Sequence, residues 1–217
     1  MTEPGHLVTL KKISGKVNTY SLMKDKIQQA FTESIQTKEK FLTTENINKI
    51  IEVAKKISAA FDNGKKLILF GNGGSSTDAS HIAAEFINRF QRERPGLPAL
   101  ALNTDMAVIT AIANDYDFSE IFSKQLKAIS EDGDIVIALS TSGNSANILK
   151  AMDVAKKKKL TTIALTGLKG DKFASKATFS FIVPSRNTPR IQETHIIIGH
   201  VICQMVEEIL FEAPRKK

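Results

Sequence analysis

A doubly wound α/β domain is the fold that the sequence predicts, and two observations carry the prediction. Five short segments rich in Leu, Ile, Val and Ala alternate along the chain with helical segments. Apolar strands in such an alternation are typical of a mostly parallel sheet covered on both faces. The 217 residues, 42% hydrophobic and 24% charged, can also bury one sizeable core. We therefore expect a single domain with a five-stranded sheet flanked by helices.

The elements follow from apolar runs and from helix start signals. Residues 1–20 are predicted to be a flexible leader, and residues 21–217 to form one domain. Two N-terminal helices are predicted at residues 21–42 and 44–63. Strands are predicted at residues 65–71, 97–102, 133–140, 160–167 and 179–184. The remaining helical segments are predicted at residues 75–90, 105–114, 118–130, 144–158 and 188–211.

The last predicted helix, at residues 188–211, contains the nearly continuous apolar run "IIIGHVICQMVEEILF". A helix that is apolar all round is buried, and at 1.5 Å per residue this one would be about 36 Å long. Burial of so long an apolar helix in a domain of this size favours a neighbouring subunit. Cys203 lies in this run, so packing is its expected role. The lone cysteine excludes an internal disulfide and a cysteine-based zinc site.

The net charge of +7 suits either a nucleic acid or small anionic substrates. Aromatic residues make up only 6% of the chain and Trp is missing, so no base-stacking platform is indicated. The run Lys156 to Lys159 ends a predicted helix, where cations suit the helix dipole. No apolar run was expected to approach the roughly 20 residues of a membrane span, and the first residues lack a secretory signal. We expect a cytoplasmic protein with neither a nucleic-acid nor a membrane partner.

Two polar loops follow predicted strands, where open α/β sheets bind ligands. The loop "GNGGSS" at residues 71–76 fails the dinucleotide fingerprint, because Ser76 stands where a third glycine is required, and the P-loop lysine is missing. The loop "STSGNS" at residues 140–145 begins a helix and contains Gly143, which permits a close backbone approach. An N-cap needs only one hydroxyl. A phosphate site is therefore favoured by the four hydroxyls of Ser140, Thr141, Ser142 and Ser145.

His81 and Glu85 are four residues apart and share one face of a helix. Such a pair can ligate a metal, act as acid and base, or form only a surface hydrogen bond. Gln192, His195 and His200 interrupt the apolar last helix, and buried polar groups need partners. A histidine in such a helix is more often a core residue than a ligand. Gln192 and His200 lie about 12 Å apart along the helix, so one metal would meet both only through extended side chains or from two subunits.

Four stretches together resemble the phosphoheptose isomerases of the sugar-isomerase (SIS) domain superfamily: "FGNGGSSTDASHIAAEF", "NDYDF", "STSGNSANI" and "RIQETHIIIGH". The resemblance covers residues 21–213. It implies an aldose–ketose isomerase that interconverts D-sedoheptulose 7-phosphate and D-glycero-D-manno-heptose 7-phosphate through an enediol. This is the first step of bacterial ADP- or GDP-heptose biosynthesis for lipopolysaccharide, capsule or S-layer glycans. It also implies a cytoplasmic homotetramer with active sites at subunit interfaces.

The resemblance implies roles residue by residue. The residues that match the base and acid are Glu85 and His200. One Zn²⁺ per site would be bound by His81, Glu85, Gln192 and His200. The sugar phosphate would contact Asn72, Gly73, Gly74, Ser75, Asn114, Asp115 and Gln192, with its phosphate on Ser140, Thr141, Ser142 and Ser145. Arg89 matches a position that often carries a substrate- or neighbour-facing arginine.

Non-catalytic SIS proteins are the alternative class. One kind binds a replication-initiator partner and lacks the metal pair, whereas His81, Glu85 and His200 are all present here. Another kind senses sugar phosphates and carries a DNA-binding domain, for which residues 1–42 offer no room. The enzyme is therefore the favoured interpretation, although it rests partly on analogy of fold.

Overall fold

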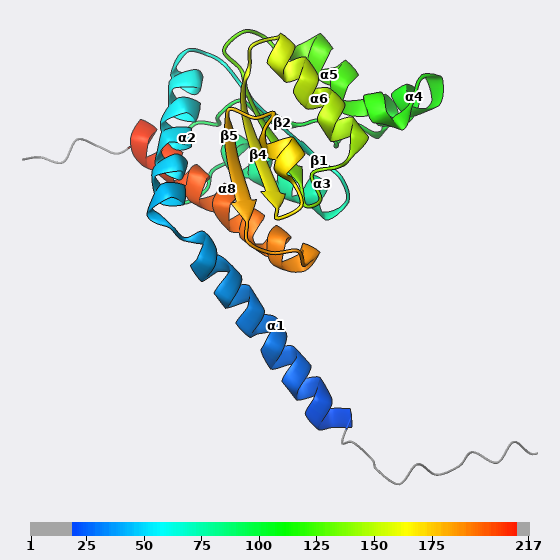
Figure 1. Ribbon diagram of the computed structural model, residues 1–217. Helices are drawn as coiled ribbons and strands as arrows, with labels where there is room; N and C mark the ends of the chain where they lie inside the picture. The colour runs from blue at the N-terminus through cyan, green and yellow to red at the C-terminus, as the bar shows by residue number, and fades with distance from the viewer. Residues whose placement is uncertain (1–18, 212–217) are drawn as a thin grey trace, which may run out of the picture.

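A five-stranded sheet lies at the centre of the computed structural model, which describes residues 19–211 (Figure 1). The strands are β1 (Leu67–Gly71), β2 (Ala99–Ala101), β3 (Ile135–Ser140), β4 (Thr161–Gly167) and β5 (Phe179–Val183). Their order is β2-β1-β3-β4-β5, and every neighbouring pair is parallel. The chain moves from β1 outward to β2 and then returns to the other side of β1. The strand order therefore reverses between β1 and β3, which is where doubly wound sheets bind ligands.

Two helical layers cover the sheet, as its alternating side chains require. One face packs against α2 (Thr44–Asp62), α3 (Gly74–Ile87) and α8 (Thr188–Phe211). The other face packs against α4 (Met106–Asp115), α5 (Ile121–Ile129), α6 (Ala146–Lys157) and α7 (Asp171–Ala174), with a 3₁₀ turn η1 (Phe118–Glu120) ahead of α5. Along β1, Leu67 and Leu69 face the first layer while Ile68 and Phe70 face the second. The predicted fold class is confirmed.

Some predicted boundaries change. Helix α1 (Thr19–Phe41) includes the last two residues assigned to the leader, while residues 1–18 and the C-terminal "PRKK" lie outside the described part of the chain. Strand β1 begins at Leu67 because the Lys66 N–H is bound by the Asp134 side chain before the strand starts. Helix α7 was not predicted, and its single turn is too short to show a period. Helix α6 ends with Lys156 and Lys157 in its last turn, as expected.

Helix α8 spans the predicted residues but is not buried all round. Ile191, Ile198 and Ile202 are in the core, whereas Ile197 and Ile209 are 42% and 47% exposed. By length and composition α8 could cross a membrane, so the expectation that no apolar run approaches such a length was wrong. A core helix passes the same test, and here α8 packs against α2 and α3. Cys203 is a buried free thiol, as predicted, and burial raises its pKa.

Candidate active site

The turn between β1 and α3 forms the first wall of the site. Gly73 has φ of +53°, and a Cβ on Gly71 would lie 2.5 Å from the Ser75 carbonyl oxygen, so both positions require glycine. The Ser75 N–H donates to the Asn72 carbonyl, and the Ser76 hydroxyl donates to the Gly73 carbonyl. The turn is thus tight and internally bonded. Gly73 and Gly74 are exposed at its tip, where a ligand can approach the backbone.

The loop after β3 forms the second wall. The Ser140 and Ser142 hydroxyl oxygens accept hydrogen bonds from the N–H groups of Gly143 and Asn144, at 3.1 and 3.3 Å. Their own O–H groups stay free to donate, and the Thr141 and Ser145 hydroxyls have no hydrogen bond within residues 19–211. Four hydroxyl-bearing residues therefore precede α6 in the chain, with Ser145 as its N-cap. This arrangement suits an anion, and the predicted phosphate site stays a prediction.

A reciprocal amide pair joins the two loops. Asn72 donates to the side-chain oxygen of Asn147, and Asn147 donates to that of Asn72, both at 2.9 Å. The Asn147 oxygen also accepts the N–H of Ile148, so it is held within α6. Asn147 was missed as a site residue, although it lies within a motif that the sequence analysis identified. It sets the spacing of the loops across the β1–β3 switch point.

His81, Glu85 and His200 converge beside α3 and α8. The His81 Nε2 lies 3.0 Å from the Glu85 Oε1 and 3.4 Å from the His200 Nε2, and three ligand atoms of this cluster lie within 4.8 Å of one another. Burial lowers the pKa of His200, the charge of His81 lowers it further, and Glu85 opposes both. Glu85 and His200 are half-buried while His81 is exposed. A carboxyl group and an imidazole with a lowered pKa thus stand close together in reach of a ligand.

A close approach of two helices makes this convergence possible. Gly199 precedes His200, and a Cβ there would lie 2.4 Å from the Cδ1 of Ile82, which follows His81. Only glycine lets α8 come this near to α3. The Phe90 ring covers the other side of His200, with ring centroids 5.4 Å apart and an interplanar angle of 26°. The two histidine rings themselves meet edge to face.

The remaining predicted residues lie apart from this cluster. The Gln192 amide packs against Gly74, because a Cβ on that glycine would lie 2.3 Å from its Nε2. Gln192 is therefore near the turn at residues 71–76, about 12 Å along α8 from His200. Asn114 and Asp115 are exposed at the end of α4 and bond to each other. Arg89 is exposed and forms an ion pair with Glu93 at 3.3 Å.

Two further titratable side chains, the half-buried Asp78 and the buried His195, have polar atoms without a hydrogen-bond partner in the described chain. Burial raises the pKa of Asp78 to about 6, against a smaller opposite effect of His81, and its Oδ2 has no hydrogen bond in the described chain. Asp78 lies one turn before His81. His195 is fully buried, and burial lowers its pKa to about 4. It is a core residue, as expected, but neither ring nitrogen forms a well-aligned hydrogen bond within residues 19–211.

The donor set fits a zinc ion. Imidazole nitrogens and a carboxylate oxygen are zinc ligands, and catalytic zinc sites keep three protein ligands with a fourth position open. His81, Glu85 and His200 supply three such atoms with their tips already together. The Gln192 amide packs against Gly74, and its place in the four-residue set implied by the resemblance stays a prediction.

Comparison with known proteins fits this geometry. The sequence model of the SIS domain matches residues 30–167. Phosphoheptose isomerase from Thermodesulfovibrio yellowstonii is 62% identical over 195 residues, covering 90% of this chain and 96% of the relative. The chain belongs to the phosphoheptose isomerase family. A phosphoheptose isomerase from Aneurinibacillus thermoaerophilus is 50% identical over 190 residues. The match covers 87% of this chain and 96% of the relative.

Solved structures agree with this assignment. A phosphoheptose isomerase from Francisella tularensis superimposes with a TM-score of 0.82 at 38% identity, covering 86% of this chain and 98% of its own. Phosphoheptose isomerase from Neisseria gonorrhoeae superimposes with a TM-score of 0.79 at 36% identity. The match covers 86% of this chain and 99% of the Neisseria chain. The chain is accordingly an enzyme, a sugar-phosphate isomerase, and the non-catalytic alternative is not supported.

Proposed function

We propose that the enzyme interconverts D-sedoheptulose 7-phosphate and D-glycero-D-manno-heptose 7-phosphate. The observation that carries the proposal is the cluster in which His81 contacts both Glu85 and His200, in a fold that also has a hydroxyl-rich loop at the β1–β3 switch point. Isomerisation of this kind needs a base at carbon, an acid at oxygen and a seat for the phosphate. The relatives named phosphoheptose isomerase supply the choice of substrate.

Glu85 is the proposed base. It would remove a proton from C1 of the ketose and return it to C2 through a planar enediol, a route that a half-buried carboxylate can serve from one face. His200 would donate to and accept from the O1 and O2 oxygens as the carbonyl moves between them. Burial lowers the pKa of His200, which favours its neutral imidazole, and the nitrogen that does not hold the zinc ion would exchange a proton with these oxygens.

A zinc ion held by His81, Glu85 and His200 is proposed as the cofactor. When bound there, it would polarise the substrate oxygens and stabilise the negative charge of the enediolate. Gln192 is proposed to contact the sugar phosphate beside Gly73 and Gly74 instead of completing this set. Loading the protein with zinc and counting ligands by X-ray absorption should give three protein ligands from one chain.

The phosphate is proposed to bind where Ser140, Thr141, Ser142 and Ser145 surround the start of α6. Free hydroxyl donors, unpaired N–H groups and the positive end of the helix dipole all favour a dianion there. The Asn72–Asn147 pair would hold this loop at a fixed distance from the sugar-binding turn. Asn114 and Asp115 would contact the substrate only if another subunit brought them there, because in this chain they project into solvent.

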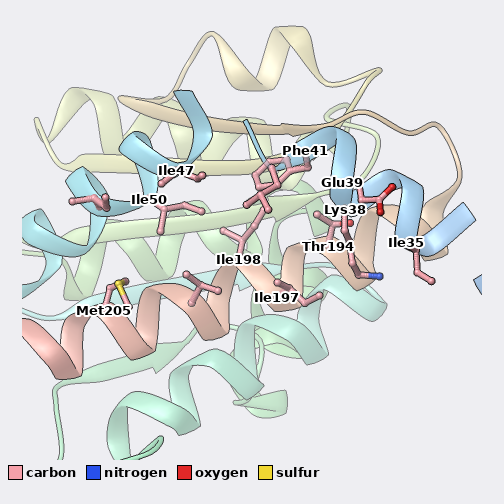
Figure 2. A pocket seen from close by; sticks show the side chains of 13 residues that line it. Ile35, Lys38, Glu39, Phe41, Ile47, Ile50, Thr194, Ile197, Ile198 and Met205 are labelled. Atoms are coloured by element: carbon pink, nitrogen blue, oxygen red, sulfur yellow. The ribbon is translucent and has the colours of Figure 1, made fainter. Parts of the chain in front are cut away.

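A homotetramer is the proposed assembly, with a second copy covering α1. Helix α1 reaches away from the domain (Figure 1), and Met23, Ile27, Phe31 and Ile35 form an exposed apolar stripe at four-residue spacing. An apolar groove of about 520 Å³ lies between α1, α2 and α8, where Ile47, Ile197 and Met205 line it (Figure 2). Exposed apolar surface of this extent indicates a protein interface. In self-association, the apolar stripe on α1 of one copy would fill the apolar groove of another copy.

Sedimentation at micromolar concentration tests this assembly. The native chain should sediment as a tetramer and Phe31→Glu as smaller species, because a charge would be buried in an apolar contact. Gln29→Lys, on the opposite face of α1, is the matched control and should leave the tetramer intact. A native chain that stays monomeric would remove the proposal.

The proposed place of the reaction is the first committed step toward a nucleotide-activated heptose, in the cytoplasm. The direct test supplies purified protein with sedoheptulose 7-phosphate and follows heptose 7-phosphate by NMR, before and after chelation. Product that disappears with chelation and returns with zinc is the expected result. If no product forms with a fully metallated protein, the substrate assignment is wrong.

A further inference from the structure

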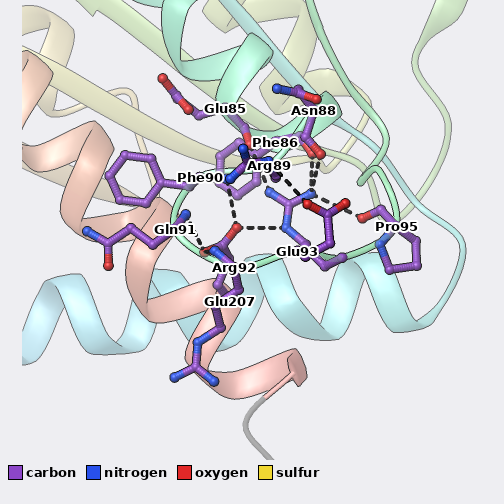
Figure 3. Close-up of polar contacts among 11 residues, drawn as sticks. Glu85, Phe86, Asn88, Arg89, Phe90, Gln91, Arg92, Glu93, Pro95 and Glu207 are labelled. Carbon is purple, nitrogen blue, oxygen red and sulfur yellow. Dashed lines mark hydrogen bonds and ion pairs between the residues drawn. The ribbon is translucent and has the colours of Figure 1, made fainter.

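Arg94 and Glu207 form a buried ion pair outside the cluster described above. The Arg94 Nε lies 2.8 Å from the Glu207 Oε1, and the two side chains are only 1% and 2% exposed. Glu207 also accepts the backbone N–H groups of Phe90, Gln91 and Arg92 at 2.9 to 3.2 Å. Figure 3 shows Glu207 entering the loop after α3 from α8. Burial raises the pKa of Glu207, but these donors outweigh it and hold the pKa below its usual value.

Arg94 closes the C-terminal end of α3 with its other nitrogens. It donates to the backbone carbonyls of Glu85 at 2.8 Å and Phe86 at 2.7 Å, and it also reaches the Pro95 carbonyl at 3.1 Å. The last carbonyls of a helix have no partner within the helix, so Arg94 satisfies groups that would otherwise be left open. The turn that it fixes is the one that carries the Glu85 side chain.

Phe90 links the same ion pair to His200. Its N–H is held by Glu207, and its ring stacks on the His200 imidazole. Glu207 and His200 are seven residues apart on α8 and share one face of that helix. One buried carboxylate thus fixes the ring that covers His200, while its arginine partner fixes the turn that carries Glu85.

We propose that the Arg94–Glu207 pair is a positioning device that holds Glu85 and His200 in register for proton transfer and metal binding. This inference rests on the proposed function for its kinetic part and on the proposed zinc ion for its affinity part. Burying two charges costs desolvation, and an apolar pair of similar size is often as stable. The pair therefore acts mainly on geometry, because Arg94 binds the backbone carbonyl of Glu85 itself and Glu207 binds the backbone N–H of Phe90, whose ring covers His200.

Three variants and a control test the proposal. Arg94→Met/Glu207→Leu removes both charges together and so avoids leaving one unpaired. Phe90→Leu breaks only the link to His200, in a half-buried residue that should not prevent folding. Arg94→Lys keeps the charge but loses the fork of donors. The matched control is Asp134→Asn, which disrupts another buried carboxylate that binds a lysine and two backbone N–H groups, at the opposite end of the strands.

The readouts are kcat, KM, thermal unfolding and the zinc dissociation constant from chelator competition. The double variant and Phe90→Leu should lower kcat and weaken zinc binding by about ten- to hundred-fold, with KM within about twofold, since the phosphate loop is untouched. Arg94→Lys should show losses of kcat and zinc affinity between those of the native chain and the double variant. Asp134→Asn should lower thermal stability while it changes kcat and zinc affinity by less than about twofold.

Zinc affinity and kcat equal to those of the native chain in the double variant and Phe90→Leu would overturn the proposal. So would losses in Asp134→Asn as large as those in the double variant, since the effect would then follow stability alone. The zinc measurement separates this inference from the proposed function. If the native chain bound zinc but turned over no heptose phosphate, only the substrate assignment would fail, and the affinity comparison would still decide the positioning role.

Discussion

The close packing of Gly199 against Ile82 predicts that Gly199→Ala will damage both stability and activity. A Cβ at position 199 would lie 2.4 Å from Ile82 Cδ1 and 2.6 Å from Cγ1. Ordinary contact begins at 3.4 Å, so the new methyl is about 1 Å too close. Ile82 is fully buried and cannot turn away freely, so α8 must move from α3.

The magnitude follows from two opposing effects. Overpacking costs about 1 to 3 kcal/mol, and replacing glycine by alanine inside a helix returns about 1 kcal/mol. We expect the free energy of unfolding to fall by up to about 2 kcal/mol. The same movement separates His200 from His81 by up to about 1 Å, and a displacement of that size costs about a hundredfold in rate.

Denaturant unfolding and steady-state kinetics of a double-mutant cycle check this account. Ile82→Ala alone should cost about 2 to 5 kcal/mol, but the pair Gly199→Ala/Ile82→Ala should cost less than the sum, because the new methyl occupies the space vacated. Ile82→Val keeps its γ carbons and should relieve the clash only in part. Gly199→Ala with native stability and native kcat would refute the reasoning.

Three further predictions follow from single contacts. Asn147→Leu leaves the Asn72 amide without its partner and should raise KM for the sugar phosphate about tenfold more than it lowers kcat, measured by initial rates. The free energy of unfolding should fall by about 3 kcal/mol as the pH drops from about 6.5 to about 4, because the unfolded chain protonates His195 while the buried ring stays neutral. In His195→Phe, urea unfolding should show a weaker dependence of this free energy on pH. Zinc should raise the unfolding temperature of the native chain but not of His81→Ala, since only the folded cluster binds it.

The sequence predicted the sheet and the site loops well because both depend on local patterns. Apolar strands that alternate with amphipathic helices predict a parallel sheet. The polar turns after β1 and β3 then lie at the same edge, where the carboxyl ends of these neighbouring strands meet. The spacing of His81 and Glu85 placed them together without further information. The resemblance to a known family added the roles of these residues, which spacing alone left open.

Contacts between distant segments could not be predicted in the same way. The Asn72–Asn147 pair joins residues 75 positions apart, and Glu207 binds a loop more than 110 positions earlier. Nothing local marks Glu207 as buried, since it lies in an apolar helix beside the half-buried Glu208. Spacing on α8 likewise left open whether Gln192 and His200 serve one metal, and only the packing against Gly74 shows where the Gln192 amide lies.

Deuterium incorporation tests the central claim most directly, namely that Glu85 moves a proton between C1 and C2. Sedoheptulose 7-phosphate would be converted in D₂O by the zinc-loaded native chain and by Glu85→Gln with its metal content measured. The account predicts that the native chain forms heptose 7-phosphate, with solvent deuterium at C2 in the fraction whose proton exchanges with water while on Glu85, and that Glu85→Gln with zinc still bound forms none of this product. Native turnover by Glu85→Gln with zinc still bound would contradict it.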